Sequence, residues 1–206
     1  MAPHYLIGLT GNTASGKSEV ARILRDDGVP VLGYDDVQRE QFPDPACANA
    51  IQAIVPFPVI LPTGGLDVPA LKQELLVHPD LVPSVWASLE RIAWPKTLER
   101  ITADMNDLLL LEAAQLYERG WNDVCDRVIA CVSDDLIRAE RIRQRYAKAG
   151  IDIPDDKIKL LLNQHMAQEE KARRSSYVIR NDGTLEDLTQ ATRTLYAQLR
   201  RDLGIF

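Results

Sequence analysis

The sequence predicts an α/β fold with a parallel β-sheet, and three observations support this. An apolar run at 4–10 is followed by a glycine-rich loop, a helical pattern at 17–28 and a second apolar run at 29–34. This strand–loop–helix–strand order is typical of parallel sheets. Further apolar runs, at 106–113 and 126–133, are separated by helical patterns. The 206 residues, 46% of them hydrophobic, suffice for a full core in one domain or in one domain with inserted lobes.

The first half of the chain contains one helix next to the loop and one mainly helical region. In the segment 17–28, Val20, Ile23 and Leu24 share a helical face, and Gly28 is a plausible stop. Residues 42–65 are rich in Pro and Gly and predict short helices and loops. The pattern from 66 to 105 is helical, which predicts a helical insertion on the sheet.

The second half alternates strands and helices. The run at 106–113 is a strand candidate, although its leucines also suit a helix, and 126–133 is a stronger strand. Helices are predicted next, with Ser133 as the N-cap of the first and Thr184 and Asp187 as a capping box of the last. The remaining predicted elements are helices at 133–150, 153–175 and 184–203, and a short strand at 176–181.

Composition excludes several classes of protein. A net charge of −6 and a pI near 5.1 do not provide the basic field of a nucleic-acid binder. The start of the chain lacks a secretory signal, and the apolar runs are too short to span a bilayer. Three cysteines without CxxC spacing predict reduced thiols and a cytoplasmic location. No obligatory protein partner is evident.

The glycine-rich loop fits the pattern G-x-x-x-x-G-K-[ST]. Its glycines let backbone N–H groups turn around phosphate oxygens, and the following helix adds its N-terminal dipole. Lys17 is expected to reach the β- and γ-phosphates, and Ser18 to ligate Mg²⁺. Switch motifs of the types D-x-x-G and N-K-x-D do not occur, which favours small-molecule phosphoryl transfer. The predicted ATP-binding residues are Gly11, Asn12, Thr13, Ala14, Ser15, Gly16, Lys17 and Ser18.

Residues 7–36, "IGLTGNTASGKSEVARILRDDGVPVLGYDD", resemble the opening of the dephospho-coenzyme A kinase family. Later segments match that family in order, among them "LLLLEAAQLYE", "RAERIRQR" and "EEKARRSSYVIRNDGTLEDL". The resemblance implies a P-loop NTPase core at 1–40 and 104–206, with a helical lid at about 134–170, and a helical acceptor-binding insertion at 41–103. It implies ATP- and Mg²⁺-dependent phosphorylation of the ribose 3′-hydroxyl of dephospho-coenzyme A, which gives coenzyme A and ADP.

The same resemblance implies roles for individual residues. Asp35 matches the second Asp of the family's Asp-Ala-Asp motif and is read as the catalytic base. Arg141 and Arg145 fall at lid positions, and Asn181 matches a loop near the nucleotide base. The sequence departs from the family's pattern, mostly on the acceptor side, at Gly33, Tyr34, Val68, Trp94, Leu108 and His165, unless Gln164 takes the place of His165.

The residues themselves leave alternatives open on the acceptor side. Asp35 ends a predicted strand, where a base can accept a hydroxyl proton, but Asp35 or Asp36 can instead cap a helix. Asp36 is a second candidate for the base. Arg39 either contacts an acceptor phosphate or pairs with Asp35 or Glu40 on the surface.

Three arginines of the segment 133–150, Arg138, Arg141 and Arg145, share one helical face. Arg141 and Arg145 are expected to stabilise charge on the transferring phosphoryl group, with Arg138 a weaker candidate. The alternative is a solvated face with pairs to Asp134, Asp135 or Glu140.

Other candidates stand beside these. Glu112 ends an apolar run and either contacts substrate or the Mg²⁺ shell or is a surface carboxylate. Asp107 is a weaker candidate for the metal shell. Trp94 and Trp86 either line a substrate groove or belong to the core. Tyr177 is expected to belong to the core.

These observations support three functional hypotheses. The first is a kinase that completes coenzyme A, with Lys17, Asp35, Arg141 and Arg145 as its catalytic residues. The second is a P-loop kinase for a nucleoside, nucleotide or sugar, which the departures at the acceptor side favour. The third is a nucleotide-binding regulatory protein with little catalysis.

Overall fold

The computed structural model describes residues 5–148 and 150–205, which form two compact units. The chain before Gly33 and the chain after Ala103 make the first unit, and Gly33–Ala103 make the second. Residues 1–4 and 206, the ends of the predicted core, lie outside the described residues, as does His4 of the first predicted strand. The assignment of core, lid and acceptor-binding roles to these parts remains a prediction.

The first unit is built on a five-stranded parallel sheet, as predicted. All five predicted strands form, and their order is β2-β3-β1-β4-β5. The strand β3 lies between β1 and β2, and its four leucines are all buried, as in a parallel sheet that is covered on both faces. Burial on both faces explains a continuous apolar run that also suited a helix. The strands are β1 Tyr5–Thr10, β2 Val31–Gly33, β3 Leu108–Glu112, β4 Arg127–Val132 and β5 Tyr177–Arg180.

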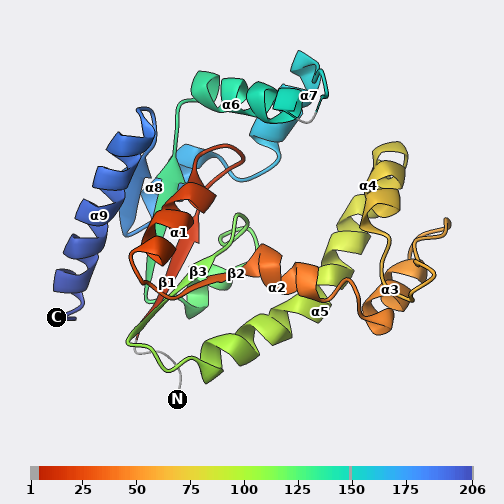
Figure 1. Cartoon of the computed structure of the whole chain (residues 1–206), viewed down its shortest axis with the longest axis horizontal. Coiled ribbons are helices and arrows are strands. Elements are labelled where there is room, and N and C mark those ends of the chain that lie inside the picture. Colours follow the sequence, from red (N-terminus) through yellow and green to blue (C-terminus); the bar gives the residue numbers. More distant parts are fainter. Residues whose placement is uncertain (1–4, 149, 206) are drawn as a thin grey trace. The chain divides into compact units, whose positions relative to one another are not determined.

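Two helices, α1 (Lys17–Asp26) and α9 (Leu185–Asp202), lie side by side and pack on one core with the sheet (Figure 1). The predicted buried face of α1 and the capping box of α9 are both confirmed. Gly28 follows α1 at φ 84°, as expected of a glycine that ends a helix. Tyr177 packs only partly against this core, because its hydroxyl donates to Asp202 at 2.6 Å.

The segment that follows β3 packs against β1, the central strand of the sheet. A Cβ added to Gly8 would lie 2.5 Å from Leu116 Cδ2, so only glycine permits this approach to β1. The segment includes the short helix η2 (Trp121–Val124), of which Trp121 is buried.

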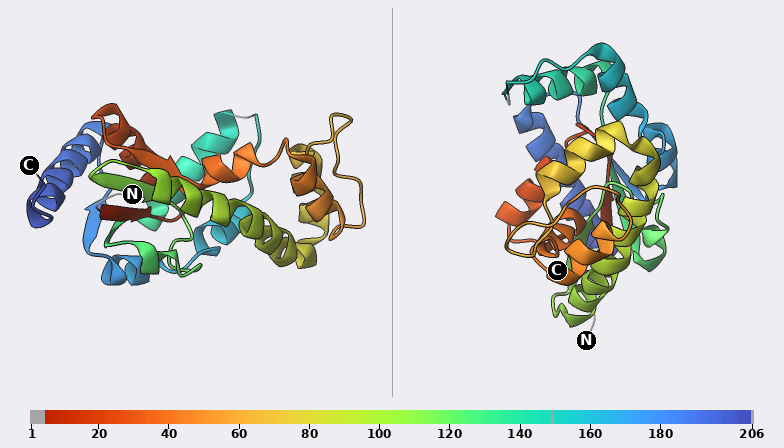
Figure 2. Two further views of the ribbon diagram at one scale, coloured as in Figure 1. Left: turned by 90° about the horizontal axis from the view of Figure 1, so that it is seen from below. Right: turned by 90° about the vertical axis from the view of Figure 1, so that its right-hand side faces the viewer.

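Three helices follow β4: α6 (Asp135–Lys148), α7 (Asp155–Asn163) and α8 (Gln168–Arg174). The helices α6 and α7 lie next to each other (Figures 1 and 2). Buried Ile142 and Ile158 belong to the small apolar cluster between them.

Two predictions about these helices are wrong. The single helix expected at 153–175 is broken between α7 and α8, because Ala167 has extended backbone at φ −53° and ψ 140°. Ser133 is not the N-cap of α6, because the carboxylate of Asp134 accepts the N–H of Leu136 at 2.8 Å. The hydroxyl of Ser133 donates instead to the carbonyl of Asn181.

The second unit is helical, as predicted for 42–65 and 66–105. Buried Val85 and Leu89 of the longest helix pack in one cluster with Cys47, Ile51 and Leu71. Asp44 and Asp67 cap two of the helices through their carboxylates. The elements are α2 Tyr34–Glu40, α3 Pro45–Gln52, α4 Val68–Val77, η1 Pro79–Leu81 and α5 Val82–Ala103. Among the described residues, no helix has the length and apolar character needed to cross a membrane.

The three cysteines are free thiols shielded from solvent to different degrees. Cys47 and Cys131 are buried and Cys125 is half-buried. Burial raises the pKa of Cys125 and of Cys131 to about 12, and it also raises the pKa of Cys47. Cys47 and Cys131 are therefore small core residues.

Candidate active site

The loop between β1 and α1 has the backbone of a phosphate cradle. Ala14 and Gly16 both have positive φ, at 62° and 100°, and α1 begins directly after Gly16. The first-turn N–H groups of a helix have no partner within the helix, so those of Lys17 and Ser18 are available to an anion.

Both glycines of the loop motif are required by close contacts. A Cβ on Gly11 would lie 2.6 Å from the carbonyl oxygen of Cys131. A Cβ on Gly16 would lie 2.0 Å from Nδ2 of Asn181. The loop therefore sits against the ends of β4 and β5, and no larger residue fits at either position.

Side chains hold the loop carbonyls from behind. Asn181 Nδ2 donates to the carbonyl of Ser15 at 2.8 Å, and Arg138 Nε donates to that of Thr13 at 2.9 Å. Because these donors engage carbonyls, the loop's conformation is fixed by the protein before any phosphate binds.

Asn181 itself is buried, with 5% of its surface exposed. Its Oδ1 accepts from Arg141 Nη2 at 3.3 Å, and its backbone N–H donates to Val132 at 2.8 Å. The structure thus brings Asn181 to the loop backbone through its side chain.

Lys17, Ser18 and Glu112 form a compact cluster at the carboxyl edge of the sheet. The register pairs Leu9 of β1 with Glu112 of β3, so this carboxylate lies beside the strand that leads into the loop. Glu112 Oε1 accepts from Lys17 Nζ at 2.6 Å and from Ser18 Oγ at 2.9 Å. The alternative of a surface carboxylate is wrong, because only 12% of the Glu112 side chain is exposed.

Electrostatics keep Glu112 ionised. Burial alone would raise the pKa of its carboxyl, but the Lys17 ammonium and the hydrogen bonds from Lys17 and Ser18 outweigh burial and lower it. The cluster therefore presents an anionic carboxylate at neutral pH.

The same cluster passes a test for Mg²⁺. A carboxylate and a hydroxyl 2.9 Å apart are hard oxygen donors of the kind Mg²⁺ prefers. Among residues 5–148 and 150–205, no group of three His, Cys, Asp or Glu side chains could hold a metal ion. Mg²⁺ here would need further oxygens, and nucleotide phosphates supply them.

Asp107 does not join this cluster. It precedes β3, at the end of the strand opposite Glu112, and its carbonyl accepts the N–H of Tyr5 at 3.0 Å. Its place at the amino edge of the sheet contradicts a role in the metal shell.

The three candidate arginines of α6, Arg138, Arg141 and Arg145, have different environments. Arg138 forms the expected pair with Asp135 at 2.6 Å, but it is 1% exposed and also donates to the carbonyl of Leu162, so the reading of a solvated face is wrong for it. Arg141 donates to Ala14 and Ser133 at 3.4 and 3.2 Å and is half-buried. Arg145 is exposed and lines a cavity of about 320 Å³ together with Thr13 of the loop.

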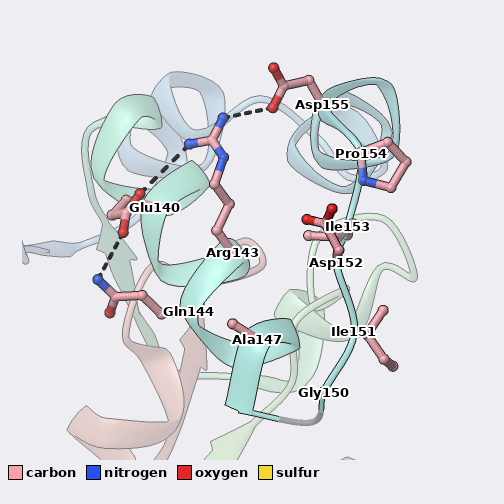
Figure 3. A pocket seen from close by; sticks show the side chains of 10 residues that line it. All are labelled: Glu140, Arg143, Gln144, Ala147, Gly150, Ile151, Asp152, Ile153, Pro154 and Asp155. Carbon is pink, nitrogen blue, oxygen red and sulfur yellow. Dashed lines mark hydrogen bonds and ion pairs between the residues drawn. The ribbon is translucent and has the colours of Figure 1, made fainter.

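A larger cavity, of about 610 Å³, lies on the other face of α6 (Figure 3). Three of its charged side chains are already paired: Arg143 binds Asp155 at 2.8 Å and Glu140 at 3.7 Å, and Gln144 donates to Glu140 at 2.9 Å. No residue of the phosphate loop is among those that line it, whereas Thr13 of the loop lines the smaller cavity.

In the second unit, α2 begins at Tyr34 with Gly33 as its N-cap, so neither Asp35 nor Asp36 caps it. A Cβ at Gly33 would lie 2.6 Å from Oδ2 of Asp36, the end of an exposed side chain. Asp35 is exposed in the first turn of the helix.

Arg39 pairs with Asp36 at 2.8 Å, not with Asp35 or Glu40 as expected. Arg39 and Asp36 lie one turn apart, whereas Glu40 pairs with Arg100. Trp94 of α5 is half-buried and Trp86 is 41% exposed.

Sequence reasoning missed a buried ion pair behind the loop. Lys171 is 1% exposed, and its ammonium lies 2.9 Å from Glu118 and donates to the carbonyl of Ala114 at 2.6 Å. Lys171 lies in the segment "EEKARR", where most residues are charged, so the sequence gives no signal that this lysine is buried.

The site and the sheet define a class. A glycine-rich loop of this geometry after the first strand of a parallel five-stranded sheet, with arginines on a helix beyond it, is the arrangement of a P-loop kinase. The chain belongs to the dephospho-CoA kinase family, whose model matches residues 5–187.

Individual relatives agree with this membership. A dephospho-CoA kinase of Gluconobacter oxydans is 32% identical over 209 residues, which cover 95% of this chain and 96% of that protein. One from Geobacter sulfurreducens is 31% identical, covering 94% and 98%.

Among solved structures, a Thermus thermophilus protein has a TM-score of 0.74 at 26% identity and covers 97% of this chain and 99% of its own. A shikimate kinase from Bacteroides thetaiotaomicron has a TM-score of 0.56 at 13% identity, covering 95% and 98%, and shows likeness of fold alone.

Proposed function

We propose that this protein transfers the γ-phosphoryl group of ATP to the ribose 3′-hydroxyl of dephospho-coenzyme A, giving coenzyme A and ADP. The observation that carries the proposal is the cluster of Lys17, Ser18 and Glu112 in a P-loop. It occurs in a chain whose family model spans residues 5–187.

The loop supplies most of the nucleotide contacts. Backbone N–H groups of Gly11–Ser18 surround the phosphates, and Lys17 moves its ammonium from Glu112 towards the β- and γ-phosphates. Ser18 would ligate Mg²⁺ and Glu112 would order its shell. A bound ion would neutralise charge on the nucleotide phosphates.

Asp35 is the proposed base. Its carboxylate accepts the proton of the 3′-hydroxyl as the oxygen forms a bond to the γ-phosphorus. The bond between that phosphorus and the bridging β–γ oxygen breaks, and its electron pair leaves with ADP. An exposed carboxylate in the first turn of α2 is free to meet a substrate hydroxyl.

Arg141 and Arg145 stabilise charge on the transferring group from the lid, which comprises about 134–170. Arg145 is the better placed of the two, because it is exposed in the cavity that Thr13 lines. Asn181 holds the loop and lies near the nucleotide base.

The second unit takes the acceptor in this proposal. Arg39 contacts an acceptor phosphate after leaving Asp36, and Trp94 lines the groove for the rest of the molecule. The reaction needs only small-molecule substrates, without nucleic acid, membrane or an obligatory protein partner. Three free thiols support a cytoplasmic location.

A coupled assay of ADP release with ATP, Mg²⁺ and dephospho-coenzyme A tests the proposal. The wild-type protein is expected to release one ADP for each coenzyme A formed, and Lys17→Ala to lose this activity. Arg143→Ala is the matched control, because Arg143 belongs to the paired cavity on the other face of α6. No coenzyme A, with ATP binding intact, would refute the proposal.

The alternatives predict different outcomes of that assay. A changed acceptor, which the departures at Gly33, Val68 and Trp94 favoured, requires faster turnover on another nucleoside, nucleotide or sugar. A regulatory protein requires ATP binding without transfer to any acceptor. Neither is favoured, because relatives named dephospho-CoA kinase match almost the whole chain.

A further inference from the structure

The break between α7 and α8 is held by side chains that replace helical hydrogen bonds. Met166, in this break, donates its N–H to Glu118 Oε1 at 2.9 Å, and its carbonyl accepts from Asn12 Nδ2 at 2.9 Å. Asn12 belongs to the phosphate loop. The break is therefore built by tertiary contacts, and one of them comes from the nucleotide site.

The loop makes a second contact with the same break. Gln164 Nε2 donates to Thr13 Oγ1 at 2.8 Å, and Arg138 joins the carbonyl of Thr13 to that of Leu162 at the end of α7. We call Asn12, Thr13, Glu118, Gln164 and Met166 the hinge clamp.

The hinge clamp is anchored to the sheet on its other side. Glu118 pairs with buried Lys171 at 2.9 Å, and Lys171 donates to the carbonyl of Ala114. That carbonyl also accepts from Thr10 Oγ1 at 3.0 Å, at the end of β1. The hinge can therefore move only if hydrogen bonds break at the end of β1 or at the phosphate loop.

Asn12 shows the strongest sign of a specific role. It is 4% exposed, and its Oδ1 is buried without a hydrogen-bond partner, so its bond to Met166 is the one that fixes its amide. A residue needed only to shape the loop would not require an amide with one unsatisfied oxygen, because a buried acceptor without a partner has lost its hydration and gained no hydrogen bond.

We propose that Asn12 and Gln164 are positioning residues that tie the lid hinge to the phosphate loop. Through the hinge clamp they set α6, and with it Arg145, over the cavity that Thr13 lines. The proposal rests on the proposed function, because it concerns the same transfer step. It adds that loop side chains, besides loop amides, control where the lid arginines lie.

Kinetics of Asn12→Ala and Gln164→Ala test this role. Each is expected to lower kcat roughly 10- to 100-fold, because misplacement by about 1 Å costs on that order, while the KM for ATP stays within about threefold. ATP hydrolysis per coenzyme A formed should rise, because a misplaced lid admits water. Arg143→Ala is the control on the other face of α6 and should match the wild type.

Variants of Thr13 test whether its hydroxyl acts through the hydrogen bond from Gln164 or whether the side chain only fills space in the loop. Thr13→Ser keeps the hydroxyl and should retain activity, whereas Thr13→Val keeps the shape and should behave like Gln164→Ala. The double variant Thr13→Val/Gln164→Ala should be no slower than either single variant, because both remove one contact. Additive losses, or a raised KM for ATP with unchanged kcat, would overturn the proposal.

Hydrogen exchange gives a readout that does not depend on transfer. In Asn12→Ala, the amides of 164–167 should exchange at least about tenfold faster than in the wild type, since opening is easier without the clamp. Unchanged exchange would refute the clamp even if the protein is active. Faster exchange in Asn12→Ala, together with a wild-type protein that makes no coenzyme A, would support the clamp and reject the proposed function.

Discussion

Replacing Lys171 by Met removes the cation of the buried ion pair behind the phosphate loop. Lys171 is 1% exposed, and its partner Glu118 keeps 22% of its side chain exposed. Breaking a fully buried pair costs about 3–5 kcal/mol, because the remaining charge stays desolvated. Glu118 regains part of its hydration here, so we expect a loss of about 2–3 kcal/mol in the free energy of unfolding.

The assay is thermal unfolding of the purified chain. For a protein of this size, 1 kcal/mol shifts the midpoint by about 2–4 °C, so Lys171→Met should unfold roughly 5–10 °C below the wild type. Lys96→Met is the matched control, because Lys96 forms an exposed pair with Glu99. Its stability should change by less than about 0.5 kcal/mol.

A double variant separates the contribution of the ion pair to stability from that of the apolar part of the lysine side chain. Lys171→Met/Glu118→Gln leaves no buried charge, so it should recover much of the stability lost in Lys171→Met. The reasoning fails if Lys171→Met is as stable as Lys96→Met. It also fails if the double variant is less stable than the single one.

Three further predictions concern the active site. Gly16→Ala should abolish ATP binding measured by calorimetry, because its Cβ would lie 2.0 Å from Asn181 Nδ2 at a backbone φ of 100°; binding at wild-type strength would contradict the contact. Glu112→Gln should be less stable than the wild type at pH 7, and urea unfolding should show this deficit shrinking as the pH falls below the ordinary carboxyl pKa of 4.5. The reason is that Lys17 helps to lower the Glu112 pKa in the folded state, so the ionised form stabilises the fold at higher pH; a deficit constant down to pH 3 would argue otherwise. Asp35→Asn should bind ATP normally and lose at least about a hundredfold in kcat, and near-normal turnover would remove Asp35 as the base.

The sheet could be predicted from the sequence because each strand is a short apolar run bounded by turn residues or by a helical pattern. The loop was predictable for a related reason: its glycines, Lys17 and Ser18 are local in sequence, and local patterns carry local geometry. The ambiguity at 106–113 was resolved only by the structure, because a strand of a parallel sheet covered on both faces is apolar on both faces, like a buried helix.

The contacts that organise the site could not be predicted in this way. Glu118, Gln164 and Met166 are polar or ordinary residues in helical patterns, and their partners lie between 48 and 154 residues away in the chain. The break between α7 and α8 was missed for the same reason, since nothing local ends the helical pattern there. Tertiary hydrogen bonds overrode a local preference.

The shielding of all three native sulfur atoms allows selective labelling of α6, which belongs to the proposed lid. Thiol-directed dyes react with the thiolate, and burial keeps the pKa of Cys125 and Cys131 at about 12. A cysteine introduced at exposed Gln144, on the outer face of α6, would therefore take up a maleimide fluorophore first at neutral pH. Such a label would report the movement of α6 in real time, with every native residue except Gln144 left in place.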